Sequence, residues 1–276
     1  MEMEHYLNLL LKTYDAKHKE STAQGYKSCL RLVCREIDAH FNFSKLKHSN
    51  ILELIVMWQE DGFANSTINN RLTHLRALCK LGYQDGLWAK NPCEGIKVLA
   101  RDELVEKKIF SKDEIQTLEH TSTRQPCAKR MMLFGYNTGI RIEEAVVLAW
   151  EDVDWENGTI SIQRSRALYE CNTPKTRHSN RIIHLTKEAL ALLNEQFSVT
   201  RDGPKHTIIM KDKSAKSAKN VEIVPIFIDD LTGNMFNNSK DFAQRFFTKF
   251  LVDAGWSIEA PHCYAIPSHH TLFPQV

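Results

Sequence analysis

The chain has 276 residues, of which 42% are hydrophobic and 25% are charged, an ordinary composition for a folded globular protein. This length predicts one large domain or two smaller ones, with a core that needs no disulfide or metal to hold it. The formal net charge of +2 excludes a strongly basic chain, so any nucleic-acid surface must come from local clusters of lysine and arginine.

The cysteines and the first residues indicate the compartment. The seven cysteines are odd in number and include no CxxC pair, and Cys29, Cys34 and Cys79 lie in stretches of apolar periodicity. That pattern is typical of buried thiols in a reducing cytoplasm. The opening MEMEHYLNLLLKTYD is acidic and its apolar run is short, so we expect neither a signal peptide nor a membrane partner.

Residues 1–98 predict a helical domain. The stretch STAQGYKSCLRLVCREIDAHF has Ser21 as its expected N-cap and apolar residues at helical spacing. A second helix is predicted in NSTINNRLTHLRALCKLGYQDG, capped by Asn65 or Ser66. Gly86 and the Asn-Pro pair at 91–92 should end this helical region.

Basic residues form stripes on both predicted helices. We expect the stripe on the second helix to fall largely off its apolar face. Such stripes can bind phosphates, although a solvated helix face is the more frequent explanation for any one of them. The candidate DNA-binding residues are Lys27, Arg31, Arg35, Arg71, His74 and Lys80.

Residues 99–109 are charged and lack a clear apolar face, which predicts a linker. The second domain then begins at residue 110, where Ser111 and Glu114 have capping-box spacing. Two helices follow, with a break at Thr138-Gly139. Alternation predicts strands in GTISIQ and NRIIHL, joined by the long connection ALYECNTPKTRHS.

The end of the second domain continues this mixed pattern. Thr186 should cap the helix TKEALALLNEQF, and two more strands are expected in HTIIMK and VEIVPIFI, on either side of the basic loop KDKSAKSAKN. The segment SKDFAQRFFTKFLVDAG predicts a last helix ended by Gly255. The fold class is therefore α+β but mostly α, with a helical N-terminal domain and a mixed domain containing a small antiparallel sheet.

Two motifs carry the chemistry. Arg141 opens a helix after the Gly139 break, and Glu144 lies three residues on, so the carboxylate can hold the guanidinium as a phosphate clamp. A surface ion pair would show the same spacing. Lys175 lies in the connection between two strands, where an ammonium can donate a proton to a leaving oxygen, or can be a solvated loop lysine.

The order of these elements and motifs resembles the tyrosine recombinases, specifically the integrases of temperate phages and related mobile elements. The resemblance covers about residues 1–260, and its most specific part is TGIRIEEAVVLAWEDVDW, supported by PKTRHSNRIIHLT in the right order. It implies a DNA-binding domain at 1–98 and a catalytic domain at 110–262. The two would clamp duplex DNA at attachment sites, as an oligomer on the DNA.

The resemblance also implies roles for individual residues. Arg141 would hold the scissile phosphate and stabilise its pentavalent transition state, with Glu144 in support. Lys175 would protonate the leaving 5′ oxygen. A tyrosine of the family forms a 3′-phosphotyrosyl bond, which conserves the bond energy and requires no cofactor and no metal.

The family motif HxxR is incomplete in this chain. His262 matches its histidine, but residues 263–276 supply neither the second arginine nor a tyrosine in the family's context. When the codons after His262 are read in a shifted frame, they permit LLRHTFASHF, which would complete the motif. The sequence therefore predicts a one-base deletion near codon 262, a non-native tail at 263–276, and a catalytically defective integrase.

Three alternatives remain open. The chain can be a non-enzymatic DNA-binding protein that competes for the attachment site. A helical transcription regulator is disfavoured by Arg141 and Lys175 in family order. A zinc site made from the tail residues His262, Cys263, His269 and His270 is the weakest, because the segment is broken by proline and has no matching cluster elsewhere.

Overall fold

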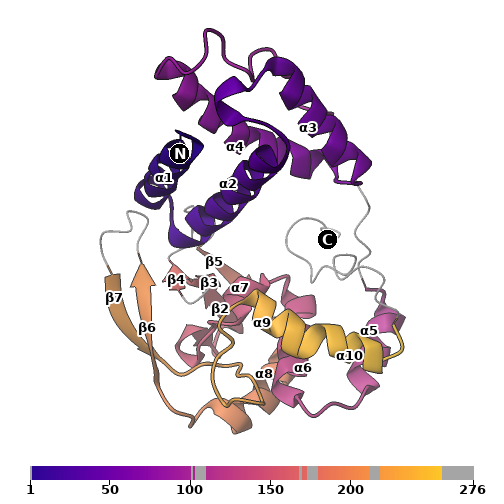
Figure 1. Ribbon diagram of the computed structural model, residues 1–276. Helices are drawn as coiled ribbons and strands as arrows, with labels where there is room; N and C mark the ends of the chain where they lie inside the picture. The colour runs from indigo at the N-terminus through magenta and orange to yellow at the C-terminus, as the bar shows by residue number, and fades with distance from the viewer. Residues whose placement is uncertain are drawn as a thin grey trace. The chain divides into compact units, whose positions relative to one another are not determined.

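A computed structural model describes residues 2–100, 102, 110–167, 170–172, 180–211 and 218–256. The chain divides into two compact units, Met1–Val105 and Glu106–Val276 (Figure 1). None of the helices in the described ranges is both long and apolar enough to cross a membrane.

The first unit is helical, as the sequence predicts. Its core is built from apolar positions at helical spacing, among them Leu30, Ile37, Leu72 and Leu75, which are fully buried. The elements are α1 (Glu2–Lys17), α2 (Glu20–His40), the 3-10 turn η1 (Phe43–Lys45), α3 (His48–Glu60) and α4 (Asn65–Gln84).

Both predicted caps in this unit are wrong. Helix α2 begins at Glu20 with Lys19 in the N-cap position, so Ser21 lies inside the helix. Helix α4 begins at Asn65 with Ala64 in the N-cap position, and alanine has no side-chain acceptor for the first amides.

Asp102 supplies the missing cap of α4 from outside the helix. Its carboxylate oxygens accept hydrogen bonds from the backbone amides of Asn65 at 2.9 Å and Ser66 at 3.1 Å. These bonds hold the pKa of Asp102 below its ordinary value. The side chain of Asn69 also bonds both backbone groups of Leu99, at 2.9 and 3.0 Å. Leu99 and Asp102 therefore belong structurally to the first unit, although the sequence assigned them to the linker.

The second unit is a mixed domain, and the predicted mostly helical α+β class is confirmed. Its helices are α5 (Lys112–His120), α6 (Pro126–Thr138), α7 (Ile142–Ala145), α8 (Lys187–Thr200), α9 (Ser239–Phe242) and α10 (Thr248–Asp253). A π-helical turn, Ala243–Phe247, joins α9 to α10 in one run, which Gly255 ends with a φ of 92°. Helices α6 and α8 pack against each other, and the core between the elements is rich in phenylalanine.

The strands form two small sheets. The first has the order β1-β2-β5, and its strands are Val153–Asp154, Thr159–Ile162 and Arg181–His184, all antiparallel. The second has the order β3-β4-β6-β7, with strands Ser165–Ala167, Glu170–Asn172, His206–Lys211 and Ala218–Ile223. Within it β4 and β6 run parallel, while the other neighbours are antiparallel.

These sheets correct two details of the sequence prediction. The connection between β2 and β5 contains the strand pair β3 and β4, which joins the second sheet, so part of it is structured rather than a plain loop. Strand β7 starts at Ala218, inside the predicted basic loop, and ends at Ile223, well before the predicted end of VEIVPIFI. The capping box at Ser111 is confirmed, since its Oγ accepts from the amide of Glu114 at 3.2 Å.

Candidate functional site

The site begins where α6 ends. Gly139 adopts a left-handed φ of 64° directly after Thr138, a conformation that suits glycine and stops the helix. Two residues later Arg141 takes the N-cap position of α7, as the sequence predicts. The chain is thus turned so that Arg141 and Glu144 face each other across the first turn.

Glu144 lies at the centre of the site and is only 5% exposed. Its Oε1 accepts hydrogen bonds from Nη1 of Arg141 at 2.8 Å and Nη1 of Arg181 at 3.0 Å. Its Oε2 accepts from the backbone amide of Arg141 at 3.0 Å and Nη2 of Arg181 at 2.8 Å. One buried carboxylate therefore fixes two guanidinium groups at once.

The electrostatics of this cluster favour an ionised Glu144. Burial raises its pKa, but the hydrogen bonds from Arg181 and Arg141 and their charges outweigh burial and hold the pKa below the ordinary value. Two arginines against one carboxylate leave a net charge of +1. The cluster is consequently a fixed, positively charged group.

Arg141 keeps donors for a ligand. Its side chain is 36% exposed, and among the described residues its guanidinium donates to Glu144 alone. A guanidinium carries five N–H donors in a planar fork that matches two oxygens of a phosphate. The arrangement can therefore bind a phosphodiester and stabilise negative charge that develops on it.

Arg181 is the site residue that sequence reasoning missed. It stands on β5 opposite Ile162 of β2, and its side chain is 20% exposed. The antiparallel pairing of β2 with β5 brings it to Glu144 across 37 residues of sequence. The only signal in the sequence was a charged residue at the start of the alternating strand NRIIHL.

A second buried ion pair follows α7. Asp152 is 6% exposed, accepts from the backbone amide of Ala149 at 3.0 Å, and pairs with Arg164. Burial raises the pKa of Asp152, and the charge of Arg164 opposes that rise without cancelling it. This pair fixes the turn that leads from α7 into the first sheet.

The other two predicted catalytic residues, Lys175 and His262, lie outside the described residues. The tail residues considered for zinc lie outside them as well. Within the described ranges no group of three or more histidine, cysteine or acidic side chains is placed to hold a metal ion.

Two of the predicted DNA-binding residues are buried, which corrects their expected position. Arg71 is 5% exposed, pairs with Glu36 at 3.1 Å, and stacks its guanidinium 4.0 Å from the ring centre of Phe63. His74 is 2% exposed and shares a 2.9 Å hydrogen bond with the hydroxyl of Tyr14. Burial lowers the pKa of His74, so it favours the neutral form.

The position of Arg71 has a simple geometric reason. It precedes Leu75 by four residues and Leu78 by seven, so all three share one face of α4. Helix α4 contacts α1, α2 and α3, which widens its buried arc to include His74. The two side chains hold the first unit together and offer little surface to a phosphate.

The remaining basic candidates are more accessible. Arg31, Arg35 and Lys80 are exposed. Lys27 is less so, with a side chain that is 20% exposed and forms a 2.6 Å ion pair with Asp15. A role of these four residues in DNA binding stays a prediction.

Comparison with known proteins finds similarity to integrases. Residues 108–227 match the phage integrase family. The chain is 33% identical to IntQ of Escherichia coli (strain K12) over 150 residues, 54% of this chain and 37% of IntQ. It is 32% identical to the prophage integrase IntR of the same strain over 135 residues, 49% of this chain and 32% of IntR. The matched part thus spans about a third of these curated relatives.

Solved structures share the fold. The integrase of transposon Tn1549, in complex with transposon right end DNA, superposes with a TM-score of 0.70 at 18% identity, covering 95% of this chain and 83% of that one. A lambda integrase dimer bound to a core site gives 0.65 at 12% identity, covering 92% and 79%.

The chain has the fold of these solved integrases, and the arginine cluster around Glu144 lies in the unit that carries the family match. Its second unit contains a domain, residues 108–227, that matches the phage integrase family.

Proposed function

We propose that this chain acts in site-specific DNA recombination, the integration and excision of a mobile element by phosphotyrosine strand exchange. The observation that carries the proposal is the cluster of Arg141, Glu144 and Arg181, a fixed positive group with donors left for a phosphate. The names of its relatives, a prophage integrase and the transposase of transposon Tn916, support the same activity.

The roles follow from the chemistry of each group. Arg141 would donate to two oxygens of the scissile phosphate and stabilise the charge of the pentavalent transition state. Glu144 would position that guanidinium rather than touch the substrate, and Arg181 would hold Glu144 in turn. Lys175 would protonate the leaving 5′ oxygen.

The partner in this proposal is double-stranded DNA carrying an attachment site, bound by several copies of the chain. Its support comes from the relatives of the fold, which include a lambda integrase tetramer bound to a Holliday junction. The exposed arginines Arg31 and Arg35 of α2 would contribute phosphate contacts that do not depend on sequence.

For the polypeptide of 276 residues we propose binding without cleavage. Residues 263–276 do not continue His262 into HxxR and offer only Tyr264 as a tyrosine, outside the family's context. A polypeptide without the second arginine and without the nucleophile would lack groups that the chemical step requires, so it would not cleave at all rather than cleave slowly. Such a chain would occupy attachment sites as a competitor.

A suicide-substrate assay separates these statements. The 276-residue chain should shift a duplex attachment site in a gel but form no covalent protein–DNA adduct. One inserted base after codon 262 restores HLLRHTF, and a version in which that frame is read on into a tyrosine of the family's context should form the adduct; Arg141→Gln in that version should abolish it. An adduct formed by the 276-residue chain would overturn the proposed defect. No shift and no adduct from either version would overturn the recombinase proposal itself.

A further inference from the structure

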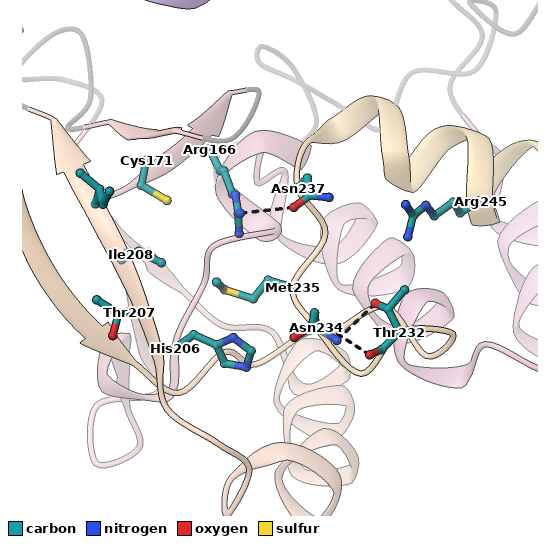
Figure 2. Close-up of a pocket in the computed structure, with 11 residues that line it drawn as sticks. Arg166, Cys171, His206, Thr207, Ile208, Thr232, Asn234, Met235, Asn237 and Arg245 are labelled. Carbon is teal, nitrogen blue, oxygen red and sulfur yellow. Dashed lines mark hydrogen bonds between the residues drawn. The ribbon is translucent and has the colours of Figure 1, made fainter.

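A cavity of about 470 Å³ lies in the second unit, separate from the cluster around Glu144 (Figure 2). Strand β3 contributes Arg166, strand β6 contributes His206, and the segment before α9 contributes Asn234, Met235 and Asn237. Its size is within the range of small-ligand sites.

Arg166 brings a charge into this cavity, and no carboxylate of the described residues pairs with it. Its Nε and Nη1 atoms are buried and have no hydrogen-bond partner among the described residues. Within the described ranges its Nη2 makes one long contact, 3.5 Å to Oδ1 of Asn237. Buried charged donors without an acceptor are costly in free energy, so Arg166 calls for a further hydrogen-bond acceptor in the cavity.

The described walls offer neutral acceptors, such as the amide oxygen of Asn237, and further donors, but no anion. His206 lines the same cavity, and its buried Nε2 also lacks a partner within the described ranges. Arg245 lines the cavity too, and pairs with Asp229 at 2.7 Å. None of the described lining residues is acidic. Figure 2 shows Arg166 reaching into the space beside Met235 and towards Asn237.

We infer that this cavity is an oxyanion site that takes a phosphate group, with Arg166 as its principal donor. A tetrahedral oxyanion supplies several acceptors at once, so it can satisfy Nε and Nη1 of Arg166 together with Nε2 of His206 when that nitrogen carries a proton. The phosphate can be free in solution or can belong to the DNA backbone. The free-anion test does not depend on the recombinase function.

The first experiment measures thermal unfolding of the full chain in sodium phosphate and in sodium chloride at equal ionic strength. At phosphate tenfold above half-saturation, the Tm should rise by roughly 3–5 °C relative to chloride. Arg166→Gln should lose that rise, and His206→Gln should reduce it. Lys205→Gln is the matched control, because Lys205 neighbours His206 in sequence, is 68% exposed and lies outside the cavity lining, and it should keep the full rise.

The stability of Arg166→Gln in chloride distinguishes a ligand-binding role of Arg166 from a purely structural one. The variant removes a buried charge without a counterion, so its Tm in chloride should equal or exceed that of the parent. If it fails to fold, His206→Gln carries the test alone.

The second experiment distinguishes the two sources of phosphate. Affinity for a short mixed-sequence duplex is measured across a salt series. A salt slope smaller by about 1 in Arg166→Gln than in Lys205→Gln identifies a backbone phosphate. An unchanged slope together with a lost phosphate effect on the Tm identifies a free anion. The site would be overturned if the slope is unchanged and phosphate raises the Tm of Arg166→Gln as much as that of the parent. It would equally be overturned if the slope is unchanged and phosphate does not raise the Tm of the parent. Water would then be the occupant of the cavity.

Discussion

Glu144→Gln is the most direct test of the arginine cluster. The variant keeps the shape of the side chain but leaves Arg141 and Arg181 without their shared counterion. Removing one partner of a buried ion pair costs about 3–5 kcal/mol. Arg141 is 36% exposed, so water screens part of that loss, and we expect about 2–3 kcal/mol. For a unit of this size the Tm should fall by roughly 5–10 °C.

The same variant makes a prediction about pH. The pKa of Glu144 is lower in the folded state than its ordinary value of 4.5, so its stabilisation is complete above 4.5 and is lost as the pH falls through the folded pKa. The difference in unfolding free energy between parent and Glu144→Gln should therefore stay constant at neutral pH and shrink below 4.5.

The measurement is urea unfolding at several pH values, with circular dichroism as the signal. Glu143→Gln is the matched control, because Glu143 carries the same charge one residue earlier but is exposed. It should change stability by less than about 0.5 kcal/mol. If Glu144→Gln costs no more than Glu143→Gln, or if its cost does not shrink in acid, Glu144 is not the counterion of two arginines.

Five further substitutions, in three experiments, test other parts of the chain. Ser111→Ala should destabilise the second unit by about 1 kcal/mol in urea unfolding, since it removes the cap; no change would dismiss that cap. A Cβ at residue 82 would lie 2.6 Å from the Trp88 ring, so Gly82→Ala should lower the free energy of unfolding by about 1–3 kcal/mol. Gly25→Ala is the control, because a Cβ there would have no atom within 4 Å, and it should not destabilise the first unit. Arg31→Gln should lower the salt slope of duplex binding by about 1, while Arg71→Gln should lower the Tm instead; a reversed result would contradict their assigned positions.

The sequence predicts local features of this fold well. Ser111 and Glu114 are three residues apart, and both halves of their capping box form within one helical turn. The Gly139 break and the start of α7 at Arg141 are equally local, because they depend on the φ of one glycine and on the next few side chains. Such features need no knowledge of the tertiary structure.

Features that depend on distant pairing were not predictable. Arg181 meets Glu144 only because β2 and β5 pair, and a single sequence does not state that register. Asp102 reaches the start of α4 across 37 residues, so the local search for a cap selected Asn65 or Ser66 instead. Arg71 shows a different failure, since the sequence prediction placed it largely off the apolar face of its helix, whereas it is buried and Glu36 neutralises it there.

The cap that Asp102 provides decides where the first unit can be cut. A fragment ending at residue 98 would lose Leu99, which Asn69 binds, together with the carboxylate that satisfies two amides at the start of α4. A fragment ending after residue 102 would keep both. The helix that carries Lys80 therefore depends on Leu99 and Asp102, two residues beyond the helical domain that the sequence predicts at 1–98.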